Sequence, residues 1–266
     1  MPTRPIHDAL SDVAEAIRKH HLATIFGWQD VAQRYQRSRI GAFWITINMS
    51  VLMLTIGVIF GSLFRTPMVD FLPYLCAGLV VWGYLSTVIG EACLTFVSAE
   101  GVILQIKIPM FTHIMRLIYR NVIVFLHTAV IIPVVLVLMG HSLSWNMLLA
   151  PFGFLLVTAN LVWISVFLSV LCARYRDITQ VIQNILQMVF YATPIIWKRD
   201  VLPEGMVQYL LNFNPAFHLV EIVRAPLLGQ LPSELSWIVA VFLLLVGSFC
   251  SLLFFGKFKD RVPYWL

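Results

Sequence analysis

Charged residues are scarce in this sequence. Lysine, arginine, aspartate and glutamate make up 12% of its 266 residues, while 60% are hydrophobic. Soluble domains carry about twice that share of charge. A water-soluble domain with this composition would expose large apolar patches and aggregate. Intrinsic disorder is excluded as well, since so many apolar side chains need burial. The composition therefore predicts an integral membrane protein.

Paired cysteines and common catalytic motifs are missing. The four cysteines lie singly in apolar stretches, without the spacing of a disulfide framework or a metal site. Gly256-Lys257 is followed by Phe258, so no phosphate-binding loop is formed there, and neither a zinc-protease nor a serine-hydrolase motif occurs. We expect no metal or cofactor on this chain. If the protein moves a solute, ATP and Mg²⁺ would have to act on a separate subunit.

Uncharged runs divide the chain into six expected transmembrane helices, because a spanning helix needs about 20 apolar residues. The expected spans are approximately 40–64, 71–97, 111–139, 147–172, 178–197 and 235–256. The fold class is thus an all-α integral membrane protein. It has a cytoplasmic N-terminal segment over 1–39 and a transmembrane domain over 40–260.

The distribution of cations predicts the orientation. Basic residues concentrate on the cytoplasmic side of membrane proteins. If both termini lie on that side, the opposite side receives only Arg65, Lys198, Arg199 and Arg224. Both termini are therefore expected in the cytoplasm. The net charge of +5 reflects this asymmetry, and we expect no nucleic-acid partner.

Two segments differ from ordinary spans and loops. Residues 10–35 predict an amphipathic helix lying on the cytoplasmic interface, with Gly27 as the place for a bend. Its apolar stripe consists of Leu10, Ala14, Ile17, His21, Ile25, Trp28, Ala32 and Tyr35. The proline-rich segment 198–234 predicts short helices that enter the outer leaflet without crossing it.

Three charges fall inside expected spans. Glu91 precedes the loop around 98–110, and Arg116 and Arg120 follow it at similar depth. Because an unpaired charge in a membrane is costly, we expect Glu91 to pair with Arg116 or Arg120. The pair could brace the helical hairpin, or it could serve ordinary structural pairing; snorkelling of the arginines to lipid headgroups is a further alternative.

Four motifs resemble the membrane subunits of type-2 ABC exporters. The run Arg34-Tyr35-Gln36-Arg37-Ser38-Arg39-Ile40-Gly41-Ala42-Phe43-Trp44 is similar to that family's R-Y-x-x-S-x-L-G-x-x-W, with isoleucine in place of leucine. The other motifs are Glu100-Gly101-Val102-Ile103 with Ile108-Pro109, Phe190-Tyr191-Ala192-Thr193-Pro194-Ile195-Ile196-Trp197, and Asn214-Pro215 followed by Ile222 to Gly229. Within that family, the chain most resembles permeases for O-antigen, capsule and teichoic acid polymers.

The resemblance implies a homodimer bound to two copies of a separate ATPase. It implies a coupling helix in the first cytoplasmic loop and a second contact in the next, formed by Ser98, Glu100, Gly101, Gln105, Lys107, Pro109, Arg174, Arg176 and Asp177. The N-terminal amphipathic helix would gate the channel through Trp28, Arg34, Tyr35 and Arg37.

The resemblance also implies that the first and fifth spans line the translocation path. Sugar rings slide well over aromatic faces, which these spans offer at Phe43, Trp44, Phe60, Phe64, Phe190, Tyr191 and Trp197. The alternative is that these aromatic residues form ordinary interfacial belts. Pro194 would bend the fifth span.

The leading functional hypothesis is export of lipid-linked O-antigen or a related surface polysaccharide across the bacterial inner membrane. The membrane lipids and the lipid-linked polymer would be the other partners. The alternatives are the same fold exporting a drug or lipid, a membrane-embedded glycan-modifying enzyme and, more distantly, a passive channel.

Overall fold

The structure is a computed structural model that describes residues 5–35, 41, 43–142, 144–199 and 203–266. These residues form helices and no strand, so the expectation of an all-α fold is confirmed for them. In chain order the elements are α1 (Pro5–Arg18), α2 (His20–Tyr35), α3 (Phe43–Leu63), α4 (Met68–Ala92), α5 (Thr95–Ser98), α6 (Glu100–Gln105), α7 (Phe111–Ala129), α8 (Ile131–Leu138), η1 (Trp145–Leu149), α9 (Ala150–Arg174), α10 (Ile178–Ala192), α11 (Glu204–Asn212), α12 (Pro215–Leu227), α13 (Glu234–Phe258) and η3 (Lys259–Tyr264).

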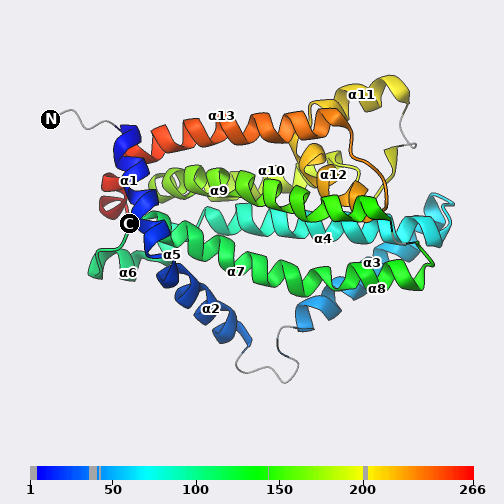
Figure 1. Ribbon diagram of the computed structural model, residues 1–266, viewed down its shortest axis with the longest axis horizontal. Coiled ribbons are helices and arrows are strands. Elements are labelled where there is room, and N and C mark those ends of the chain that lie inside the picture. The colour runs from blue at the N-terminus through cyan, green and yellow to red at the C-terminus, as the bar shows by residue number, and fades with distance from the viewer. Residues whose placement is uncertain (1–4, 36–40, 42, 143, 200–202) are drawn as a thin grey trace.

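Five helical segments in the described part of the chain are long and apolar enough to cross a membrane. They are Phe43–Leu63, Met68–Ala92, Phe111–Leu138, Trp145–Arg174 and Glu234–Tyr264. Helices α4, α9 and α13 run along the long axis of the molecule, and both chain ends lie at the same end of it (Figure 1). We call this the terminal end, and the other the distal end.

The expected span 178–197 is only partly helical. Helix α10 has 15 residues and ends at Ala192, so it is about 22 Å long at the usual rise per residue. Thr193 adopts an extended conformation, with ψ 134°, because the following Pro194 disfavours helical backbone before it. The expectation of one continuous helix to residue 197 is therefore wrong. Beyond it, the proline-rich segment forms the short helices α11 and α12.

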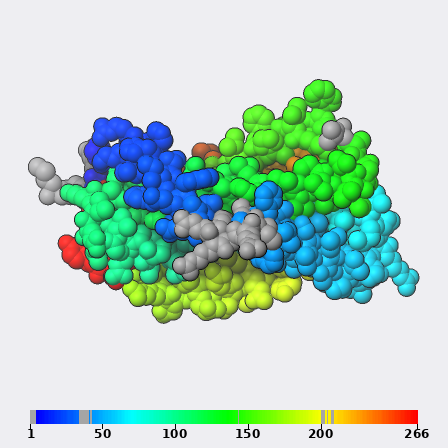
Figure 2. Space-filling model, turned by 90° about the horizontal axis from the view of Figure 1, so that it is seen from below, coloured from blue at the N-terminus to red at the C-terminus, as the bar shows by residue number. Residues whose placement is uncertain are grey.

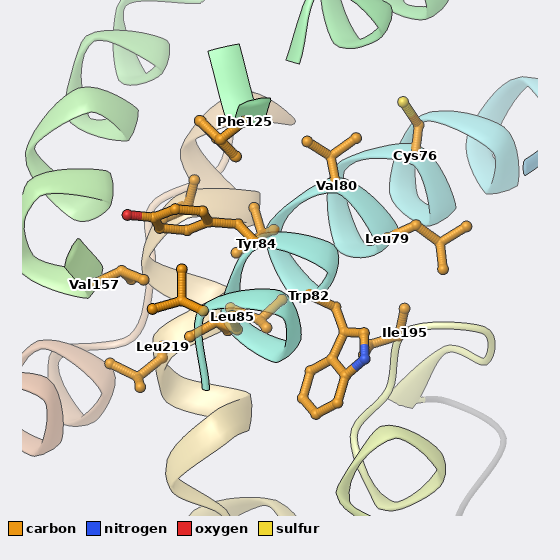
Figure 3. Packing of buried hydrophobic residues seen from close by; sticks show 14 of the residues in the cluster. Cys76, Leu79, Val80, Trp82, Tyr84, Leu85, Phe125, Val157, Ile195 and Leu219 are labelled. Atoms are coloured by element: carbon orange, nitrogen blue, oxygen red, sulfur yellow. The ribbon is translucent and has the colours of Figure 1, made fainter. Parts of the chain in front are cut away.

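Helix α4 lies at the centre of the core. In the apolar 18-residue stretch of α4, 72% of the residues are buried. The same fraction is 11% in α3 and 22% in the segment that contains α13. Tyr84 of α4 points toward Phe125 of α7 (Figure 3), with ring centroids 5.1 Å apart, and its hydroxyl lies 3.1 Å from Thr158 Oγ1. Phe125 in turn stacks on Phe154 at 4.3 Å. These contacts pack α4, α7 and α9 against one another.

Helix α12 packs closely on α9 through a glycine. A Cβ atom on Gly153 would lie 2.2 Å from the backbone oxygen of Ile222, so only glycine permits this approach. The side chain of Asn214 accepts hydrogen bonds from the amides of Ala216 and Phe217 and so caps the start of α12.

The N-terminal amphipathic segment forms two helices instead of one. The break lies at Lys19, and the expected bend at Gly27 is absent because Gly27 sits inside α2 against α7. Small residues face the protein: Ala9, Ala16, Ala23 and Val31 are buried. Large residues of the expected stripe, namely Leu10, Ile17, Ile25 and Trp28, are exposed instead. Small side chains allow close helix packing and leave the bulky apolar ones facing outward.

Helix α1 joins segments that are distant in sequence. The carboxylate of Asp12 accepts hydrogen bonds from the backbone amides of Met110 (3.2 Å) and Phe111 (2.9 Å) at the start of α7. The ammonium group of Lys259 donates to the Asp8 carbonyl oxygen at 2.9 Å and lies 3.8 Å from Asp12. Helix α1 therefore fastens α7 to the C-terminal helix.

Candidate functional site

Helix α10 has one polar face. Gln180, Gln183, Asn184 and Gln187 follow the i, i+3, i+4, i+7 spacing that places side chains on one side of a helix. None of the 15 residues of α10 is buried within the chain. Carboxamides are costly in hydrocarbon unless they are hydrogen-bonded. This face therefore needs water, a polar ligand or another protein surface beside it.

The polar face of α10 borders a groove of about 730 Å³ against α4. Gly90 brings the two helices together, since a Cβ atom there would lie 2.8 Å from Gln183 Nε2. At the distal side of the groove, Trp82 and Phe190 pack with ring centroids 5.7 Å apart. The groove is lined by Trp82, Ser86, Thr87, Gly90, Glu91, Leu94, Gln180, Gln183, Asn184, Leu186, Gln187 and Phe190. It thus combines amides, hydroxyls and aromatic rings, and these lining residues include no lysine, arginine or histidine.

The opposite face of α10 is apolar. It borders a cleft of about 360 Å³, where Ile182, Ile185 and Val189 face residues of α4, α9, α12 and α13. Trp82 and Leu186 line both the groove and this cleft. Helix α10 therefore separates a polar space from an apolar one.

Ion pairs connect the terminal end of the groove to the N-terminal helices. Arg120 donates to Glu91 at 2.6 Å and to Asp30 of α2 at 3.0 Å. Arg116 donates to Asp30 through Nε at 2.7 Å and through a terminal nitrogen at 2.5 Å. Asn121 also donates to Glu91, at 2.7 Å. We call Asp30, Glu91, Arg116 and Arg120 the ion network.

The ion network differs in part from the expectation. Glu91 pairs with Arg120, whereas Arg116 pairs with Asp30, which the sequence analysis did not consider. Asp30 is the one acidic residue of α2, and it meets α7 because Gly27 brings the helices close: a Cβ there would lie 2.8 Å from Tyr119. A lone acid in an amphipathic helix was the available signal. Its partner depends on helix packing.

Asp30 is held ionised by this arrangement. Burial raises the pKa of Asp30, but hydrogen bonds and positive charge from Arg116, and then from Arg120, outweigh burial and leave the pKa below its ordinary value of 3.8. Asp30 therefore carries a negative charge between the two guanidinium groups at neutral pH.

The seven aromatic residues expected to line a channel occupy different surroundings. Phe190 lines the groove. Phe43 and Trp44 are 64% and 60% exposed on α3, which lies on the outside of the molecule (Figure 2). Phe60 and Phe64 pack on each other at 5.8 Å. Tyr191 is exposed, and its carbonyl accepts a hydrogen bond from the Trp197 indole at 3.1 Å. Within one chain, only Phe190 of the seven meets the groove.

The residues expected to contact an ATPase gather at the terminal end. Helix α6 carries Glu100, Gly101 and Gln105, has no buried residue and projects from the body (Figure 1). Ser98 ends α5, and Lys107 and Pro109 follow α6.

The second expected contact lies between α9 and α10. Arg176 donates to the Leu266 carbonyl oxygen at 3.3 Å, and Arg174 lies over the rings of Tyr175 and Trp265. Asp177 immediately precedes α10. Both expected contact segments therefore belong to the same end of the molecule.

The expected gate residues are only partly described. Trp28 is 59% exposed on α2. Arg34 and Tyr35 form the end of that helix, with side chains outside the described set, and Arg37 lies outside the described residues altogether. The part of α2 that is described is held to α7 by the ion network.

Five membrane-length helices in the described chain, and a polar groove between α4 and α10 with paired charges at its end, fit a multi-pass transport subunit. Residues 22–228 match the family described as ABC-2 type transporter, and the chain belongs to this family. The resemblance found in the sequence is confirmed.

Curated relatives share low but extended similarity. The O-antigen export system permease protein RfbA of Myxococcus xanthus is 21% identical over 74% of this chain and 76% of that protein. A permease of the same name from Klebsiella pneumoniae is 23% identical over 88% of this chain and 90% of that protein.

Proposed function

We propose that this chain is the membrane subunit of an ATP-driven exporter that moves a lipid-linked O-antigen or related surface polysaccharide across the bacterial inner membrane. Its membership of the ABC-2 family and the names of its relatives support this proposal. The chain would act as a homodimer with two copies of a separate ATPase, which binds ATP and Mg²⁺. Both termini would be cytoplasmic.

In this arrangement α10 is the fifth of six membrane-inserted segments, despite its length. Its polar face would border the translocation path, completed by a second copy of the chain. Helix α6 and the segment around Arg174 to Asp177 would contact the ATPase. The N-terminal segment 1–39 would gate the path, and residues 40–260 would form the transmembrane domain.

The groove between α4 and α10 carries the proposal. Sugars are recognised by amide and hydroxyl groups that exchange hydrogen bonds with hydroxyls, and by aromatic rings that contact their C–H faces. Gln183, Gln187 and Trp82 supply these groups, as do their neighbours. The lining holds one ionisable group, Glu91, which Arg120 neutralises. A polyanionic polymer would require cations along this path, so the groove favours an uncharged glycan.

The proposal is tested by combining Gln183→Leu with Gln187→Leu in the source bacterium, with the neighbouring genes intact. Loss of two hydrogen-bonding groups should reduce surface polysaccharide at least about tenfold, since each net hydrogen bond contributes about 1 kcal/mol. Lipid-linked polymer should accumulate in the cytoplasm. Met188→Leu is the matched control, because Met188 is 69% exposed on α10 and does not line the groove.

Two outcomes would contradict the proposal. Wild-type export by the double variant, at equal protein level, would show that the groove is not the path. Unchanged surface polysaccharide after deletion of the gene would reject polysaccharide export and favour a drug or lipid exporter.

A further inference from the structure

Basic residues gather in one pocket at the distal end of the molecule. The described lysines and arginines at this end are Arg65, Lys198, Arg199 and Arg224. The last three line a single pocket of about 450 Å³. Three of these four cations therefore meet in one pocket, and the partners of each show which of them can hold a ligand.

Arg224 forms the floor of this pocket. It is 1% exposed, donates to the Pro194 carbonyl oxygen at 2.5 Å and to Glu221 at 2.5 Å, and lies 4.2 Å from the ring centre of Tyr74. Tyr74 also donates to the Pro194 oxygen, at 2.7 Å. All of these groups have partners, so Arg224 shapes the pocket rather than offering free donors.

Lys198 and Arg199 are the available donors. Their closest described interactions are with aromatic rings: Lys198 lies 5.9 Å from the centre of Tyr74, and Arg199 lies 5.9 Å from the centre of Phe217. Among the described residues, no carboxylate lies within 4 Å of either cation. Within the described part of the chain, neither cation is therefore neutralised by a carboxylate.

The charge of the lining limits the ligand. Lys198, Arg199 and Arg224 are opposed by Glu221 and by Asp70 at the pocket edge, which leaves one net positive charge. An ammonium and a guanidinium group that line the same pocket suit the oxygens of a phosphate group, to which arginine can donate through two nitrogens. His141 and Gln230 complete the lining with polar groups.

We propose that this pocket binds the phosphate ester of a lipid at the distal membrane surface. The lipid would be either the carrier of the exported polymer or a membrane phospholipid, which share this chemistry. The role of the pocket, receiving a lipid phosphate where the path ends, rests on the proposed function. Binding of a lipid phosphate to the pocket does not rest on the proposed function.

The test measures binding of farnesyl phosphate and of inorganic phosphate to the complete complex with its ATPase, in a non-ionic detergent that contains no phosphate, by titration calorimetry. Lys198→Gln combined with Arg199→Gln should weaken farnesyl phosphate binding at least about tenfold, since it removes two charged hydrogen-bond donors. Lys198→Arg should retain binding. Arg65→Gln is the matched control: it removes a cation at the same end, exposed and outside the pocket, and should change affinity less than about twofold.

Equal weakening by Arg65→Gln would show general surface attraction and overturn the site, as would unchanged binding in the double variant. Competition by phosphatidylglycerol added to the complex in detergent would identify a membrane phospholipid as the ligand. Tighter binding of farnesyl phosphate than of inorganic phosphate, without that competition, would identify the carrier.

The same variants separate this inference from the proposed function. A complex that exports polysaccharide and binds farnesyl phosphate without Lys198 and Arg199 would overturn the site alone. A complex that binds through them but exports no polysaccharide would overturn the proposed function and leave the site in place.

Discussion

Replacing Asp30 with asparagine should release α2 from α7. Asp30 accepts three hydrogen bonds from Arg116 and Arg120, and its side chain is 14% exposed. Exposed ion pairs contribute about 0.2–1 kcal/mol, whereas breaking a buried pair costs about 3–5 kcal/mol. The two arginines are 27% and 21% exposed, which places this site between those limits. We expect Asp30→Asn to cost about 2–3 kcal/mol.

Hydrogen exchange of the α2 amides measures this cost directly. At tenfold per 1.4 kcal/mol, protected amides of α2 should exchange about 30- to 140-fold faster in the variant. Glu15→Gln is the control, because Glu15 of α1 forms a half-exposed pair with Lys19, and its removal should leave exchange in α2 unchanged. An acceleration below about threefold in a folded Asp30→Asn protein would refute the view that the ion network holds α2.

Two further predictions concern the packing of α2 on α7 and the packing of α12 on α9. The pKa of Asp30 is lowered in the folded protein, so its contribution to the stability of the fold is complete above pH 3.8 and is lost as the pH falls through the lower folded pKa. Spin labels on α2 and α7 should therefore separate only under such acidic conditions. Separation of the labels near neutral pH would contradict this. Gly153→Ala should lower the free energy of unfolding by about 1–3 kcal/mol by forcing α9 from α12. Thermal unfolding checks this against Gly101→Ala, whose added Cβ meets nothing within 4 Å; equal midpoints would contradict it.

The spans could be predicted because hydrocarbon thickness sets their length. Uncharged runs mark where a helix can cross, and helices occupy four of the six expected segments almost in full, with the second ending earlier. The end of α10 was harder to predict. The absence of charge up to residue 197 predicted a span that ends there. The helix instead ends at Ala192, because Pro194 sterically disfavours helical backbone in the residue before it.

The side of a helix that faces the protein was less predictable. In residues 10–35 the bulky apolar stripe was an obvious candidate for burial, yet Ala16 and Ala23 are buried while Ile17 and Ile25 are exposed. Apolar side chains gain little from leaving lipid for protein, so close packing of small residues decides the contact. Periodicity alone does not show this preference.

The groove was missed for a related reason. Aromatic residues drew attention because they suit sugars, but they make up 13% of the chain and so discriminate poorly. The amides of α10, from Gln180 to Gln187, recur at helical spacing within an expected span, and that pattern was the better signal. The partner of Asp30 was beyond sequence reasoning, since it depends on how α2 crosses α7.

The position of α1 imposes an order on biosynthesis. Its partner Lys259 leaves the ribosome after all the spans have been made, 251 residues later than Asp8. The contact of α1 with Lys259 therefore forms later than its contacts with the start of α7. Until then Asp12 can accept hydrogen bonds from Met110 and Phe111, but its carboxylate lacks the nearby ammonium group of Lys259. Full attachment of α1 thus requires synthesis and insertion as far as Lys259, and chains that stop before α13 would hold this helix through α7 alone.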